Sequence, residues 1–219
     1  MLRLILLSAL LYDCLSAGSA HGQEKKLERF LLSNSTFSES RAPLYMAKEL
    51  GLFEKYGLDA EIVNIRGAAI KANIDRVKAR GATLNVLTGS DEQGLEVSGG
   101  DFFTTREFLR SRPGQVKAML RAFSDAIKMG RENKELFHRA IRKFMKEENP
   151  KLLESFYESN YFFGAVPHKP RPLERALDFD IKDLSATVPE LVGRKAADFI
   201  DATLLGEVER EGFFSWVKP

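Results

Sequence analysis

The sequence has almost no cysteine: Cys14 is the only one, and it lies within the first 22 residues, whose composition is that of a removable leader. Residues 23–219 therefore contain no thiol, which excludes a disulfide framework, a cysteine nucleophile and a cysteine-ligated metal from that part of the chain. Histidine is also scarce. His21, His138 and His168 are the only three, and none belongs to an H-E-x-x-H or similar metal-binding motif. We expect no metal site.

Long apolar runs are missing as well. A membrane-spanning helix needs about 20 apolar residues, and no segment of the sequence reaches that length. The run Leu4–Tyr12 is shorter than this; it follows Arg3 and precedes small residues that end in Ala20-His21-Gly22. A charged start, a short apolar centre and a small-residue end are typical of a secretory signal peptide. We predict a signal peptide over residues 1–22 and export of the remainder; the alternative is that this segment forms a buried first helix or strand.

Neither an excess of one charge nor a catalytic signature is present. The 33 basic residues nearly balance the 31 acidic ones, and no basic block marks a nucleic-acid-binding face, so we expect no nucleic-acid partner. No G-x-S-x-G nucleophile elbow occurs. Residues 89–94, GSDEQG, space two glycines like a phosphate-binding loop but lack its Lys-Ser/Thr pair. We predict no catalytic residue and no cofactor.

What is present is a chain that is 44% hydrophobic, with 16 phenylalanines able to fill a core. Residues 27–33 alternate and then become apolar, as a buried strand does. The polar turn SNSTFSES at 33–40 follows, and we expect Ser38 or Ser40 to cap a helix that has Pro43 in its first turn.

This helix is expected to end at Gly57, before a second strand at 59–65. A strand, a helix and a strand in this order predict a parallel pair with a right-handed crossover. The next segment repeats the pattern, with helical spacing around residues 70–77 and a strand at 82–87.

The C-terminal half is predicted to be helical. Ser111 is the expected cap of its first helix, and His138 is expected to face solvent because Glu135 and Arg142 are its helical neighbours. We expect helices over 113–131, 132–147, onward from Pro150, 172–184 and 189–202, and then a short helical tail.

Two polar turns follow the ends of the first two strands. The carboxyl ends of parallel strands meet at one edge of a sheet, where ligands of α/β proteins bind, and helix N-termini bind anions there. Gly67 allows a ligand to approach the backbone, and Arg66 adds a charge-assisted contact. The alternative is that the serines are only caps and Arg66 a solvated residue. The candidate ligand-binding residues are Asn34, Ser35, Thr36, Phe37, Ser38, Arg66, Gly67 and Ala68.

Residues 41–69, RAPLYMAKELGLFEKYGLDAEIVNIRGAA, resemble the opening of periplasmic solute-binding proteins that serve ABC importers for sulfonates, nitrate and thiamine precursors. That family begins with a signal, a strand, a polar ligand loop and a helix of the form P-x-x-x-A-x-x-x-G-x-F-x-x-x-G-L. Residues 104–135 are similar to its late helices and residues 198–214 to its closing tail. The motif occurs here as Pro43, Ala47, Gly51, Phe53, Gly57 and Leu58.

The resemblance implies an α/β fold of the type 2 periplasmic-binding-protein kind, with a parallel or mixed sheet flanked by helices, a reduced second lobe and a helix-rich C-terminal half. A block that completes the first lobe and supplies most of the second in the family is missing near residues 70–77. Within one domain at 23–219, the first lobe would span 27–80, a residual crossover strand and loop 82–103, and the C-terminal helices 106–219.

The resemblance also implies a function. A small, anionic or heteroaromatic solute would lie against the loop at 34–38 and the turn at 67–69, with stacking on Phe37. The loaded protein, a monomer or weak dimer in the periplasm, would then dock on the membrane subunits of an ABC importer.

Two alternatives stay open. The first is a shortened paralogue that folds but binds nothing, because the second-lobe block is missing. The second is an enzyme like the thiamine-pyrimidine synthases that resemble this family. Those relatives carry a cysteine-rich motif and an active-site histidine, whereas residues 23–219 have no cysteine and the ligand loop has no histidine.

Overall fold

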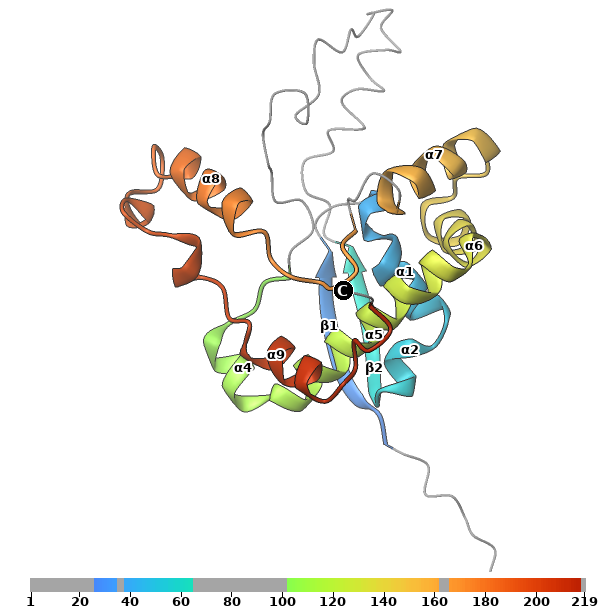
Figure 1. Cartoon of the computed structure of the whole chain (residues 1–219), viewed down its shortest axis with the longest axis horizontal. Coiled ribbons are helices and arrows are strands. Elements are labelled where there is room, and N and C mark those ends of the chain that lie inside the picture. The colour runs from blue at the N-terminus through green and yellow to red at the C-terminus, as the bar shows by residue number, and fades with distance from the viewer. Residues whose placement is uncertain (1–25, 35–37, 65–101, 162–165, 218–219) are drawn as a thin grey trace, which may run out of the picture.

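The computed structural model describes residues 26–34, 38–64, 102–161 and 166–217 (Figure 1). Several sequence predictions lie outside these residues, namely the signal peptide at 1–22, the helix around 70–77, the strand at 82–87, and the site residues Ser35, Thr36, Phe37, Arg66, Gly67 and Ala68.

The sheet of the described chain consists of two parallel strands, β1 (Glu28–Asn34) and β2 (Leu58–Asn64), in register from Glu28 opposite Leu58 to Asn34 opposite Asn64. The predicted parallel pair is thus confirmed. Side chains alternate between the two faces of a strand, and every second residue of β1 from Phe30 onward is buried. The opposite face carries Leu31, which is 61% exposed.

The connection between the strands contains a short 3₁₀ turn, η1 (Glu39–Arg41), and two helices, α1 (Ala42–Glu49) and α2 (Leu52–Lys55). The prediction of one uninterrupted helix up to Gly57 is wrong. Gly51 adopts a left-handed backbone conformation with φ of 65°, which ends α1 and redirects the chain.

The predicted serine cap of this helix is also wrong. The residue before α1 is Arg41, and no side chain caps the helix. Ser38 precedes η1 without a side-chain capping bond, because the Ser38 and Ser40 hydroxyls bond each other at 2.7 Å. The two serines therefore stabilise the turn instead of the helix.

Four helices follow: α4 (Arg106–Ser111), α5 (Pro113–Glu132), α6 (Lys134–Met145) and α7 (Pro150–Tyr161). The predicted helices near 113–131, 132–147 and from Pro150 are confirmed. Ser111, however, ends α4 and does not cap α5. The side-chain caps include Thr105, which accepts from Phe108 N, Asn133, which accepts from Glu135 N, and Asn149, which accepts from Lys151 N.

The core lies where α1 packs between α5 and α6. Residues 42–47 of α1 are all buried, as expected of a helix that has neighbours on every side. On α5, Ala118, Ala122 and Ala126 recur every fourth residue and are buried, so their small side chains form a groove for a neighbouring helix. Phe137 and Ile141 of α6 close the core and are fully buried.

Residues 172–200 form an arm that projects from this body (Figure 1). The arm contains α8 (Glu174–Leu184) and two 3₁₀ turns, η2 (Pro189–Leu191) and η3 (Ala196–Asp198), which pack mainly against α8. The helix predicted at 172–184 is confirmed, whereas the helix predicted at 189–202 is wrong. Gly193, with φ of 77°, separates the two turns and prevents a continuous helix.

After the arm, α9 (Thr203–Arg210) returns to pack on α5, and the predicted helical tail is confirmed. The fold is therefore mixed α/β and helix-rich, with a small parallel sheet. No helix within the described ranges has the length and apolar character that crossing a membrane requires.

Candidate functional site

The carboxyl end of β1 faces the start of α1, as the sequence analysis expected of a ligand site. Asn34, the last residue of β1, is 5% exposed and donates from Nδ2 to Tyr45 Oη at 3.2 Å. Ser38 is half-buried and bonds Ser40. We call Asn34, Ser38, Ser40, Arg41 and Tyr45 the strand-end site; of the predicted ligand-binding residues, only Asn34 and Ser38 belong to the described chain.

Asn34 and Tyr45 are the buried members of the strand-end site. The Tyr45 ring is completely buried and stacks on Phe144 of α6, with ring centroids 5.0 Å apart and an interplanar angle of 7°. Burial raises the pKa of Tyr45, and the Asn34 hydrogen bond and the charge of Arg41 offset part of this rise. Tyr45 is therefore neutral at physiological pH. Because its side-chain amide already donates to Tyr45, Asn34 serves to orient Tyr45.

Arg41 supplies the positive charge of the strand-end site, and the sequence analysis did not single it out. It immediately precedes α1, and its Nε atom is buried without a hydrogen-bond acceptor among the described residues. A buried N–H group that has no acceptor is unusual and unfavourable. An anion placed here would receive a charge-assisted hydrogen bond beside a helix N-terminus. The signal available in the sequence was an arginine between a polar turn and a helix start.

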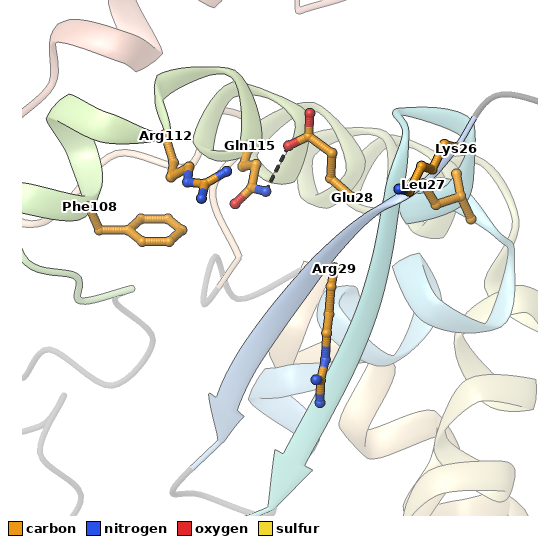
Figure 2. Close-up of a pocket in the computed structure, with 7 residues that line it drawn as sticks. All are labelled: Lys26, Leu27, Glu28, Arg29, Phe108, Arg112 and Gln115. Carbon is orange, nitrogen blue, oxygen red and sulfur yellow. Dashed lines mark hydrogen bonds between the residues drawn. The ribbon is translucent and has the colours of Figure 1, made fainter.

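A hollow of about 660 Å³ opens at the amino end of β1 (Figure 2). Figure 2 shows the side chains of Arg112, Gln115 and Glu28 together, whereas Arg29 points away from this group. Gln115 is buried and donates from Nε2 to Glu28 Oε2 at 2.7 Å. The lining residues are Lys26, Leu27, Glu28, Arg29, Phe108, Arg112 and Gln115.

This hollow has weaker binding chemistry than the strand-end site. Its buried polar group, Gln115, already has a carboxylate partner, and Arg29 pairs with Glu61 at 3.4 Å in an exposed position. The hollow also lies at the amino end of β1, whereas ligands of open α/β sheets bind at the carboxyl ends. Sequence reasoning did not anticipate it, because its residues come from distant segments with no shared motif.

The histidines of the described chain belong to no metal-binding cluster. Within the described ranges, no group of three His, Cys, Asp or Glu side chains could hold a metal ion. His138 was expected to face solvent, but it is 8% exposed and lies beside the rings of Phe137 and Tyr157. The prediction failed because α7 covers this face of α6. Burial lowers the pKa of His138, and the nearby carboxylate of Glu135 opposes this shift.

Comparisons with protein-family models, with curated proteins and with solved structures found no match to this chain.

Proposed function

We propose that this chain is an exported solute-binding protein, not an enzyme, and that it captures a small anionic or heteroaromatic solute and delivers it to an ABC importer. The observation that carries the proposal is the buried Nε–H of Arg41, which has no acceptor among the described residues and lies at the start of α1. The solute anion is the missing acceptor. The motif that begins at Pro43 supports the two other parts of the proposal, delivery to an ABC importer and a periplasmic location.

The chemistry of the strand-end site favours binding over catalysis. Tyr45 is held neutral and buried, so it does not serve as a base at physiological pH. The guanidinium of Arg41 carries hydrogen-bond donors only. Hydroxyl groups at Ser38 and Ser40 and one guanidinium together favour an acceptor-rich solute through charge and hydrogen bonding.

The proposal is tested by thermal melts of the full chain against alkylsulfonates, nitrate, aromatic acids and thiamine-pathway pyrimidines. A solute at about 100 times its Kd should add roughly 2.7 kcal/mol to the free energy of unfolding and raise the Tm by a few degrees. Arg41→Met should abolish the shift. Arg110→Met, which removes an exposed arginine of α4, is the matched control and should leave the shift unchanged.

Other outcomes separate the alternatives. A cooperative melt that no solute moves would overturn the proposal and favour a shortened paralogue that folds without binding. Consumption of a pyrimidine precursor or cofactor by the full chain would favour the synthase-like enzyme. A Tm shift that survives Arg41→Met but not Arg110→Met would move the site away from the strand ends.

A further inference from the structure

Another hollow, of about 300 Å³, shares no lining residue with the strand-end site and draws on three segments of the chain. Lys128, Arg131 and Glu132 come from the last turns of α5, His168 from the loop before the arm, and Trp216 from the turn after α9. His168 and Glu132 are exposed, and the other three side chains are half-buried. We call this hollow the Arg131 site.

Two N–H donors in the Arg131 site lack an acceptor. Nε of Arg131 and Nε1 of Trp216 are both buried, and neither has a hydrogen-bond partner among the described residues. Buried donors are nearly always paired in folded proteins, so two such groups on residues that line one small hollow indicate an acceptor that the described residues do not supply.

Arg131 is held in place before any ligand arrives. Its Nη1 donates to the main-chain carbonyl of Tyr161 at 3.2 Å, and its Nη2 donates to the carbonyl of Val166. The guanidinium also lies 5.2 Å from the centre of the Tyr161 ring. A guanidinium that is fixed in this way loses little conformational freedom when it binds an anion. Its Nε–H has no acceptor among the residues that the structure describes.

The charge and shape of the Arg131 site define the ligand class. Lys128 and Arg131 contribute two positive charges, while Glu132 is the acid among the described lining residues and lies 3.9 Å from Lys128. The Trp216 indole adds a flat apolar surface beside an N–H donor. A volume of about 300 Å³ is at the lower limit of small-molecule pockets.

We propose that the Arg131 site binds a small organic carboxylate whose apolar part packs against Trp216. The carboxylate oxygens accept from Arg131 Nε and Trp216 Nε1, and Lys128 contributes a longer-range attraction. The lining of this site shares no residue with the strand-end site, so Arg131→Met and Arg41→Met distinguish binding of an aromatic acid at the two sites.

Trp216 is the only tryptophan in the sequence, so its fluorescence reports on this site directly. We expect benzoate, titrated into the full chain, to change the emission of Trp216 with a saturable dependence on concentration. Benzamide, the neutral analogue of nearly the same shape, should change it much less because it lacks the charge. Arg41→Met, at the strand-end site, should leave the benzoate titration unchanged.

Substitutions at the site give graded effects. Arg131→Met should weaken benzoate binding at least about tenfold, because it removes a charge-assisted hydrogen bond. Glu132→Gln should strengthen binding by no more than about fivefold, because it removes an exposed opposing charge. Lys128→Met should weaken binding by a similar small factor, and it keeps the test valid if Arg131→Met fails to fold.

The result that overturns the proposal is equally direct. Emission that stays constant up to millimolar benzoate, or that responds equally to benzamide, would show that the hollow does not select a carboxylate. A benzoate titration unaffected by both Lys128→Met and Glu132→Gln would place the bound ligand elsewhere.

Discussion

The body and the arm of this molecule have similar hydrophobic patterns but bury them differently. In the body, Phe53, Ile127 and Phe137 are fully buried, whereas in the arm Phe179 is 42% exposed and Phe199 is 52% exposed. The buried apolar residues of the arm are two alanines and one larger side chain, namely Ala176, Ala196 and Ile181. An amphipathic pattern therefore makes a core only where a second element presents a matching face, as α1 does for α5 and α6.

The largest contrast between the two regions is expected from removing one phenylalanine in each. Phe137→Ala deletes a fully buried ring of the body and should lower the free energy of unfolding by about 3–5 kcal/mol. Phe179→Ala, on the arm helix α8, should cost less than about 1 kcal/mol because the ring is already 42% exposed. Urea unfolding measures both; equal losses would show that the arm is part of the same core.

Gly130 tests how tightly the body is packed. A Cβ atom added at this position would lie against Tyr161 Oη, 2.7 Å from Tyr161 Cζ and 3.2 Å from Met46 Cε. Gly130→Ala should therefore destabilise the chain by about 1–3 kcal/mol, although alanine is the better helix former.

The control for this prediction is Gly206→Ala in α9, where nothing described lies within 4 Å of the new Cβ. That change should stabilise the chain by about 0.5–1 kcal/mol through helix propensity alone. If both alanines stabilise the chain in thermal melts, the contact between Gly130 and Tyr161 is looser than described.

A smaller effect on the free energy of unfolding is expected from the polar contacts that connect the end of α2 to α5. Tyr56 Oη donates to Asp125 Oδ2 at 2.6 Å, and Lys55 pairs with the same oxygen at 2.6 Å. Tyr56→Phe removes the first of these bonds and should cost about 0.5–1.5 kcal/mol in urea unfolding. A cost near zero would mean that Lys55 alone fixes Asp125.

The smallest effect is a pH dependence from His138 in the body. Because burial lowers the pKa of folded His138 below the value in the unfolded chain, the unfolded chain binds more protons in the window below pH 6.5. Stability should therefore fall as the pH is lowered from 7.5 towards 5, with a slope smaller than that of one proton. The charged groups near this ring are Glu135, Glu154, Arg142 and Lys134.

His138→Phe should flatten this part of the profile measured by thermal melts between pH 5 and 7.5. His168→Phe, which changes an exposed loop residue, is the control and should leave the profile unchanged. A profile that stays the same in His138→Phe would contradict the account of the buried ring.

The sequence predicted the elements that depend on local pattern and on glycine or proline at a boundary. The parallel strands, the long helix that begins at Pro113 and the helix from Pro150 were all predictable, because each combines a clear apolar period with a boundary residue. The break at Gly51 was not, since a glycine inside a helical pattern is often tolerated.

The burial of His138, the environment of Arg41 and the Arg131 site could not be predicted, because each depends on residues that become neighbours only in the folded chain. His138 is flanked by charged residues at helical spacing, and only the packing of α7 buries it. Arg41 becomes distinctive only when the folded chain leaves its Nε without an acceptor among the described residues. The Arg131 site joins α5 to segments about 37 and 85 residues further along, which no local motif connects.

The most direct test of the central claim is amide hydrogen exchange of the full chain, measured alone and with whichever solute raises the Tm. We predict that the solute slows exchange in residues 38–46, around Arg41 and the first turn of α1, while exchange in the arm at 172–200 stays unchanged. Protection that appears only in the arm, or only around Phe108 and Arg112 at the amino end of β1, would contradict a binding site at the strand ends.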